Sequence, residues 1–253
     1  MPTPEFIVPD WPAPASVKAA ISTRSGGVSE GAYASFNLAH HVGDSEPAVE
    51  DNRRALQNTL KLPGPPQWLE QVHGTQVVEA QADDWVRTAD GCVTDQPGLA
   101  CSVLTADCLP VLLCNRQGTR VAAAHAGWRG LASGVLAAAV ARFNEPSADL
   151  MAYLGPALSQ EHFEVGVEVL EAFFEAARNA EHADQVAASF CPSERPLHFR
   201  ADLYALARAE LQALGLTRVY GGDYCTYRDS ERFYSFRRDG TTGRMASLIW
   251  INS

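Results

Sequence analysis

Three side chains that can bind a metal or carry out covalent catalysis stand where apolar runs end. His73 lies at a bend before a glycine, Cys108 lies in a polar turn between two apolar runs, and His125 ends a third run. If the fold brings them together, they offer two imidazole nitrogens and one sulfur. Three protein ligands with a free fourth position are typical of catalytic zinc, which lowers the pKa of its bound water to about 7.

The same three residues leave other interpretations open. Copper also binds two histidines and one cysteine in electron-transfer sites. Without a metal, the Cys108 thiolate could act as a nucleophile with a histidine as its base. The structural alternative is that all three are buried packing residues, since free cysteine is often buried.

Charged residues near the three indicate an anion site. Arg129 lies at the predicted start of a helix, where free backbone N–H groups and the guanidinium fork can bind phosphate. Asp107, next to Cys108, is predicted either as a general base or as the carboxylate that orients a metal-bound histidine, unless it only pairs with Arg129. Arg24 adds a cation to the glycine-rich loop 23–29, which taken alone indicates a tight turn, although such loops also hold anions.

The elements that must position these residues follow from the hydrophobic pattern. Short apolar runs predict strands at 17–22, 92–94, 102–104, 109–114, 121–124, 151–154, 217–220, 233–236 and 246–251. Residues 67–78 are predicted as strand, turn and strand. Helices are predicted from Asp44 or Ser45 to a point before Pro63, from Gly127 onward, over 166–180 and over 201–214, whereas 181–200 is predicted as a polar connection.

This mixture of hairpins and separate helices predicts one α+β domain with mixed β-sheets. Residues 1–16 are expected to form an irregular N-terminal arm, and 17–253 the catalytic domain. We see no internal repeat, low-complexity tract or linker. No charged coiled coil or exposed apolar helix indicates a partner chain, so we expect a monomer.

Composition narrows the classes of function. The chain has 253 residues, 46% of them hydrophobic, and can bury a large core. Its formal net charge is -10 and it has no run of Lys or Arg, so we expect no nucleic-acid partner. The proline-rich N-terminus lacks the apolar segment of a signal peptide, and we expect a cytoplasmic protein without a membrane partner. Six cysteines without a CxxC pair argue against a disulfide framework.

Ten short segments, taken together and in order, resemble one protein family. They are residues 22–29, 37–38, 41–44, 71–74, 104–110, 124–130, 154–156, 163–166, 225–227 and 243–244. The chain resembles the laccase-domain (YfiH-type) family, also called the polyphenol oxidase family or peptidoglycan editing factor. The resemblance covers nearly all of 17–251 and is specific, because several unusual strings recur together.

The resemblance implies an α/β/β/α sandwich and a metal site made of His73, Cys108 and His125, with zinc favoured over copper. It implies an enzyme that phosphorolyses adenosine, inosine, guanosine and methylthioadenosine and deaminates adenosine, with purine nucleoside and phosphate as its small-molecule partners. Four further residues lie in the shared motifs, and we expect them to contact the substrate or phosphate: Arg24, Asn37, Asp107 and Arg129.

Three other hypotheses compete with the nucleoside enzyme. Family members are also described as cell-wall editors that remove L-Ser from a cytoplasmic muropeptide precursor, which would use Cys108 as a nucleophile. The family's oldest label is copper-dependent phenol oxidation, but a multicopper cluster needs many imidazoles and the chain has seven histidines. A non-catalytic nucleoside- or metal-binding protein is the fourth hypothesis, and turnover would exclude it.

Overall fold

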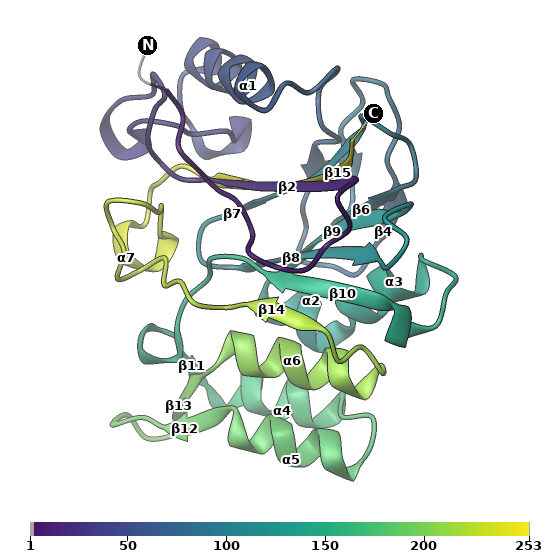
Figure 1. Ribbon diagram of the computed structural model, residues 1–253. Coiled ribbons are helices and arrows are strands. Elements are labelled where there is room, and N and C mark those ends of the chain that lie inside the picture. The colour runs from purple at the N-terminus through teal and green to yellow at the C-terminus, as the bar shows by residue number, and fades with distance from the viewer. Residues whose placement is uncertain (1–2, 253) are drawn as a thin grey trace.

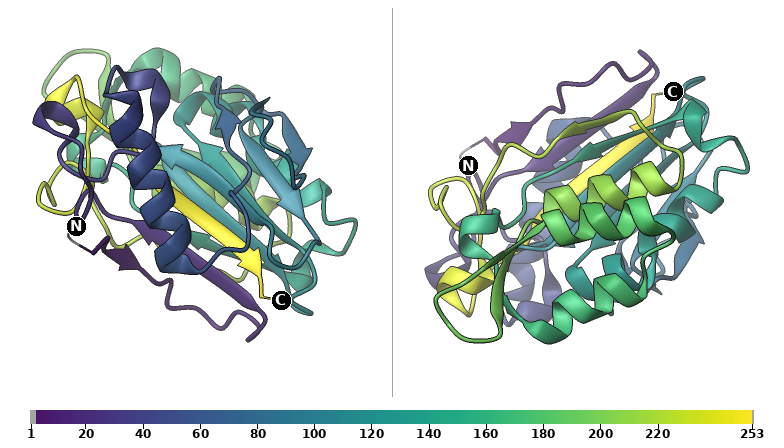
Figure 2. Two further views of the ribbon diagram at one scale, coloured as in Figure 1. Left: turned by 90° about the horizontal axis from the view of Figure 1, so that it is seen from above. Right: turned by 90° about the horizontal axis from the view of Figure 1, so that it is seen from below.

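Four layers of secondary structure lie on one another in the computed structural model, which describes residues 3–252 (Figure 1). Helix α1 (Glu46–Leu60) forms the first layer, a four-stranded sheet the second, a six-stranded sheet the third, and a group of helices the fourth. Seen from above, the dark-blue α1 lies over one sheet, and seen from below, the green helices cover the other (Figure 2). The predicted α/β/β/α sandwich is confirmed.

The four-stranded sheet is antiparallel and includes segments near both ends of the chain. Its order is β1 (Phe6–Ile7), β2 (Val17–Ser22), β15 (Met245–Ile251) and β7 (Ala100–Thr105). Part of the expected irregular arm is therefore an edge strand. Helix α1 begins after Ser45 and ends at the left-handed Lys61, close to its predicted limits, and packs Leu56 onto the sheet.

The six-stranded sheet is mixed and carries the centre of the chain. Its order is β14 (Val219–Gly221), β10 (Leu150–Leu154), β8 (Leu109–Asn115), β9 (Val121–Ala126), β6 (Gly91–Thr94) and β4 (Val77–Glu79). Two neighbouring pairs, β14 with β10 and β4 with β6, are parallel, and the others are antiparallel. Every residue of β8 and β9 is buried, because the sheet is covered on both faces, and this explains their continuous apolar runs.

The fourth layer covers the outer face of the six-stranded sheet. It contains α2 (Trp128–Ser133), α3 (Val135–Ala141), α4 (Val167–Glu175), α5 (Ala180–Ala188) and α6 (Leu203–Ala213). Leu136 and Leu211 are among its fully buried side chains. None of the helices within residues 3–252 combines the length and the apolar character that a bilayer crossing needs.

The prediction of a polar connection over 181–200 is wrong. The segment contains α5 and two strands, β12 (Phe190–Pro192) and β13 (His198–Ala201), which form a small sheet with β11 (Glu164–Gly166). Asn179 begins α5 by accepting a hydrogen bond from the backbone N–H of His182. Only His182 and Val186 of α5 are buried, a stripe too short for the hydrophobic pattern to reveal.

The strand predicted over 233–236 is also absent from the described chain. Phe233 and Tyr234 are buried without pairing as a strand, and Ser235 caps the short helix α7 (Phe236–Asp239) by accepting from the Arg238 N–H. Apolar residues alone predicted a strand here, but the cap and the side-chain hydrogen bonds of Arg238 favour a turn of helix.

The segment 67–78 contains two strands, but they do not pair with each other. β3 (Leu69–Glu70) pairs with β5 (Arg87–Thr88), whereas β4 joins the six-stranded sheet. His73 lies in the loop between β3 and β4. The remaining short elements are the 3₁₀ turns η1 (Gly31–Tyr33), η2 (His40–Val42), η3 (Ser147–Asp149) and η4 (Gln160–His162).

Candidate metal centre and active-site cavity

The fold brings His73, Cys108 and His125 together. One ligand atom from each lies within 4.8 Å of the others, and within residues 3–252 no other group of His, Cys, Asp and Glu side chains meets this standard of a metal site. The Cys108 Sγ is 3.9 Å from His73 Nε2, and the two imidazole centroids are 4.8 Å apart. They come from the β3–β4 loop, the β7–β8 turn and the end of β9, so both main sheets contribute to their placement.

Asp90 orients both histidines, although sequence analysis did not select it. Its fully buried carboxylate lies 2.8 Å from His125 Nδ1, which leaves Nε2 of that ring facing the cluster. The same carboxylate accepts backbone N–H groups of Val72, His73 and Gly74 at 3.2, 2.9 and 2.6 Å. These bonds hold His73 at a φ of 60°, a conformation rare outside glycine.

Glycine at two positions allows α2 to lie against the cluster. A Cβ at Gly127 would lie 3.0 Å from Cys108 Sγ and 3.1 Å from His73 Cδ2. A Cβ at Gly130 would lie 2.9 Å from the carbonyl oxygen of Gly74. The glycines of this predicted motif therefore provide close packing around the cluster.

The three groups strongly affect one another's ionisation. Burial alone would raise the pKa of the Cys108 thiol, but the charge of His125 and hydrogen bonds from both histidines lower this pKa to about 6. Burial alone would lower the pKa of His125, but Cys108 and Asp90 raise it to about 9. Burial would likewise raise the pKa of Asp90, yet His125 and the Gly74 N–H keep it below its usual value.

This donor set fits a divalent metal such as zinc. Two imidazole nitrogens and a thiolate are common zinc ligands, and a carboxylate that holds the second nitrogen of a ligand histidine is a frequent accompaniment. Asp90 provides that carboxylate for His125. The fourth direction is open, because all three residues line a cavity of about 430 Å³.

The cavity lining combines cationic and apolar side chains. Its lining includes His41 and the arginines Arg129, Arg237 and Arg244. Burial and then the charge of Arg244 lower the pKa of His41. The apolar lining is formed by Leu104, Trp128, Leu158, Phe163, Leu203 and Phe236. The arrangement suits a small molecule with a flat apolar portion and an anionic portion.

Two of the four predicted substrate contacts, Arg129 and Asp107, line this cavity. The Arg129 guanidinium carbon lies 4.6 Å from the centroid of the Trp128 ring. The Asp107 carboxylate accepts hydrogen bonds from the Thr226 hydroxyl and the Arg237 N–H, both at 2.6 Å. The alternative of an Asp107–Arg129 ion pair is not observed in the described part of the chain.

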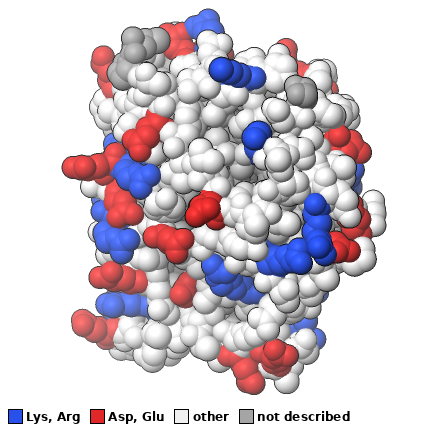
Figure 3. Space-filling view, viewed as in Figure 1, with Lys and Arg blue, Asp and Glu red and all other residues white. Residues whose placement is uncertain are grey.

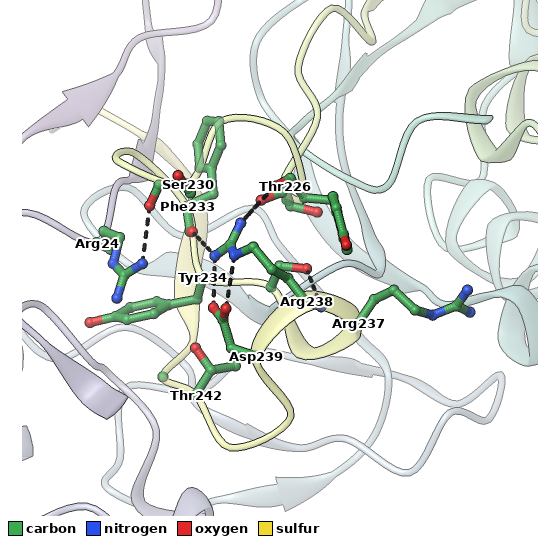
Figure 4. Close-up of polar contacts among 12 residues, drawn as sticks. Arg24, Thr226, Ser230, Phe233, Tyr234, Arg237, Arg238, Asp239 and Thr242 are labelled. Atoms are coloured by element: carbon green, nitrogen blue, oxygen red, sulfur yellow. Dashed lines mark hydrogen bonds and ion pairs between the residues drawn. The ribbon is translucent and has the colours of Figure 1, made fainter. Parts of the chain in front are cut away.

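The other two predicted contacts, Arg24 and Asn37, do not line the cavity. The Arg24 guanidinium donates to the carbonyls of Ala34 and Ser230 and lies over Tyr234, on the opposite side of the 226–242 segment from Arg237 (Figure 4). Asn37 is fully buried, and its side-chain oxygen accepts the backbone N–H of Arg244. Both side chains form hydrogen bonds within the protein, and these bonds give Arg24 and Asn37 a structural role.

Two backbone segments were considered as anion sites, the glycine-rich loop 23–29 and the start of helix α2, and neither is well suited to bind an anion. In the glycine-rich loop, Asn52 accepts the N–H of Val28 and Ser35 accepts that of Gly27, as in a structural turn. Helix α2 has only six residues, so its dipole is small. The cationic lining instead includes His41, Arg237 and Arg244. The family segments 41–44 and 243–244 contain His41 and Arg244, whereas Arg237 lies in none of them.

Comparison with known proteins identified related chains. The model of a family described as multi-copper polyphenol oxidoreductase laccase matches residues 18–252. A protein named purine nucleoside phosphorylase from Pseudomonas aeruginosa is 53% identical over 246 residues, which cover 97% of this chain and 98% of the relative. The purine nucleoside phosphorylase YfiH of Escherichia coli is 47% identical over 253 aligned residues, covering 98% and 99%.

A solved structure is similar over the same range. The crystal structure of a Neisseria meningitidis protein of the DUF152 family superposes with a TM-score of 0.92 at 51% sequence identity. The superposition covers 98% of this chain and 99% of that one.

Proposed function

We propose that this chain, which belongs to the family described as multi-copper polyphenol oxidoreductase laccase, is a metal-dependent enzyme that phosphorolyses purine nucleosides. Relatives that match nearly its whole length are named purine nucleoside phosphorylases. The observation that carries the proposal is one cavity that is lined by the His73–Cys108–His125 cluster, by arginines and by aromatic rings.

The arginines suit the phosphate co-substrate. Arg129, Arg237 and Arg244 gather at one cavity of a chain whose net charge is -10. Guanidinium groups bind phosphate through pairs of parallel hydrogen bonds. Acidic and basic groups are interspersed over the face seen in Figure 3, so the cationic lining is a local feature.

The apolar lining suits a purine base and ribose. Trp128, Phe163 and Phe236 line the cavity with aromatic rings against which a flat heterocycle can pack. A volume of about 430 Å³ lies within the range of small-molecule sites. We therefore propose adenosine, inosine, guanosine and methylthioadenosine as substrates.

In phosphorolysis, a phosphate oxygen forms a bond to C1′ of the ribose while the C1′–N9 bond breaks. The base leaves with the electron pair and takes up a proton, and ribose 1-phosphate is released. The arginines would neutralise and orient the phosphate against C1′, which removes much of the entropic part of the barrier. A zinc ion held by His73, Cys108 and His125 would act as a Lewis acid and would lower the pKa of a bound water. We propose that the enzyme also deaminates adenosine, in which water replaces the amino group at C6 and ammonia is released.

The test is turnover by metal-analysed protein. Adenosine and inosine are incubated with phosphate, and products are followed by chromatography. We expect adenine or hypoxanthine with ribose 1-phosphate, and inosine from adenosine, and expect both activities to be lost in His125→Ala. Cys191→Ala is the matched control, because Cys191 is exposed and lies outside the cavity. Absence of nucleoside turnover with metal present would reject the proposal.

A second candidate is an amidase that uses Cys108 to act on a cell-wall precursor. It is favoured by the Cys108 Sγ, which lies 3.9 Å from His73 Nε2 and opens on the cavity. Such an enzyme stays active with a chelator present, and its substrate protects Cys108 from alkylation. The nucleoside enzyme loses its activity to the chelator and recovers it on addition of zinc.

Copper-dependent phenol oxidation has less support. Beyond the pair in the cluster and His41, the remaining imidazoles have other surroundings. His40 pairs with Glu50, His162 stacks on Tyr227, His182 is buried beside a glutamate, and His198 Nδ1 lies 2.9 Å from the carbonyl oxygen of Pro196. The geometry therefore suits one metal ion, for which we propose zinc.

A further inference from the structure

We propose that Asp107 is a positioning residue, which ties the Cys108 turn to the segment that carries Arg237, and that it does not transfer protons. This inference rests on the proposed function only for its kinetic test. The tie itself is a property of the fold and has a separate test below.

Both carboxylate oxygens of Asp107 already have donors from the protein. Oδ1 accepts the hydroxyl of Thr226 and Oδ2 accepts the backbone N–H of Arg237, each at 2.6 Å. The Thr226 side chain is fully buried, and Asp107 is 7% exposed. Each oxygen keeps a second lone pair, but a proton taken up by either oxygen would weaken one of these two short hydrogen bonds, which disfavours the carboxylate as a general base.

Hydrogen bonds make residues 226–239 one connected piece, of which Phe236 and Arg237 line the cavity. The Arg238 guanidinium donates inward to the carbonyls of Thr226, Tyr227 and Phe233, which joins residues 226–239 (Figure 4). The Arg237 side chain extends from this piece and donates to the Glu164 carbonyl at 3.0 Å. Asp107 connects the piece to the turn that carries Cys108.

The backbone conformation of Asp107 allows its side chain and that of Cys108 to point in different directions. Its φ of 89° lies in the region that favours glycine and tolerates Asn and Asp better than other residues. This conformation lets the carboxylate face Thr226 while the next side chain, Cys108, faces the histidines. Substitutions at position 107 must respect this φ to be informative.

Two substitutions respect that φ and separate the roles. In Asp107→Asn, the amide oxygen can accept the Arg237 N–H and the amide nitrogen can donate to the Thr226 oxygen, so the tie persists without a carboxylate. Asp107→Gly removes the tie without backbone strain. Thr226→Val removes one of the two bonds and leaves the carboxylate in place.

The three variants should differ in their KM for phosphate. Asp107→Gly should raise the KM for phosphate by about tenfold to a hundredfold, since small displacements of binding groups are costly. Thr226→Val should raise it by about fivefold, the equivalent of one hydrogen bond. Asp107→Asn should stay near the wild-type value with an unchanged pH profile of kcat. An inactive Asp107→Asn beside a normal Thr226→Val would overturn the proposal and assign proton transfer to Asp107.

Hydrogen exchange tests the tie without any assay of activity. The amide of Arg237 should exchange faster in Asp107→Gly than in the wild type or Asp107→Asn, while thermal unfolding shows that each variant is folded. Unchanged protection in Asp107→Gly would refute the tie. If the wild type turns over no nucleoside, the proposed function fails, but the exchange result still decides the role of Asp107.

Discussion

At the scale of single residues, two buried aspartates position other residues of the site through hydrogen bonds. Asp90 holds the His73 loop and the His125 ring through backbone and side-chain bonds to one carboxylate. Asp107 holds the segment that carries Arg237. Both are buried, so each needs its hydrogen-bond partners to offset the cost of burying a charge.

Asp90→Asn should weaken metal binding by about 10- to 100-fold, because His125 loses the acceptor that fixes its tautomer and orientation. Competition with a zinc-binding dye measures the change. Asp84→Asn, in an exposed loop, is the control and should bind metal as the wild type does. Equal affinities in both variants would contradict the role assigned to Asp90.

The six cysteines should differ in their reactivity toward an alkylating reagent. Cys191 is exposed and Cys108 partly exposed, whereas the other four are buried, and burial raises the pKa of Cys114 to about 12. We expect iodoacetamide to modify Cys108 and Cys191 of the metal-free protein near neutral pH, and zinc to protect Cys108 alone. Intact mass spectrometry counts the adducts, with Cys191→Ser as the control. Modification of Cys108 at the same rate with and without zinc would argue against its being a ligand.

At the scale of elements, the close approach of α2 to the cluster depends on small residues. Gly127 precedes α2 and faces Cys108 and His73, and Gly130 faces the loop of His73. Helix α2 therefore packs directly against the cluster, and there is little space for larger side chains at these two glycine positions.

Gly127→Ala should lower metal affinity and activity, because the added Cβ would lie 3.0 Å from the Cys108 sulfur. Overpacking of this kind costs about 1–3 kcal/mol. The backbone φ at Gly127 is -61°, so alanine causes no backbone strain there. Gly64→Ala, whose Cβ would meet nothing within 4 Å, is the matched control. Metal titration and thermal unfolding of both variants would show whether the effect is local to the cluster.

At the scale of the whole molecule, the cluster lies where the two sheets are joined. Cys108 follows β7 of the four-stranded sheet and precedes β8 of the six-stranded sheet, and His125 ends β9. A metal held there would connect both sheets to the β3–β4 loop. Folding stability and metal binding should therefore be linked.

Removal of the metal should lower the Tm. A ligand at 100 times its Kd stabilises the folded state by about 2.7 kcal/mol, which corresponds to roughly 5–10 °C for a chain of this size. Differential scanning calorimetry with chelator, and again after zinc is restored, measures the shift. The variant His125→Ala should show no shift with zinc. A wild-type Tm that does not respond to zinc would contradict metal binding by the folded chain.

The predictions that held came from local signals of sufficient length. Strands β7, β8 and β9 were predictable because each is a buried apolar run bounded by polar turns, and α1 because its stripe and both ends are marked in the sequence. Helices α5 and α7 were missed because side-chain caps and few buried residues define them.

Apolar periodicity along the sequence predicted an α+β domain with mixed sheets, whereas recurring local motifs indicated the family and, through the resemblance, the sandwich and the three residues that meet at the cluster. The charged groups that surround the cluster became known from the packed fold. Asp90 and His125 are 35 positions apart, Asp107 and Arg237 are 130 apart, and Arg24 does not line the cavity although it lies in a family motif. Hydrogen bonds of this kind depend on the direction of each side chain after the sheets have packed, and no spacing along the chain encodes that direction.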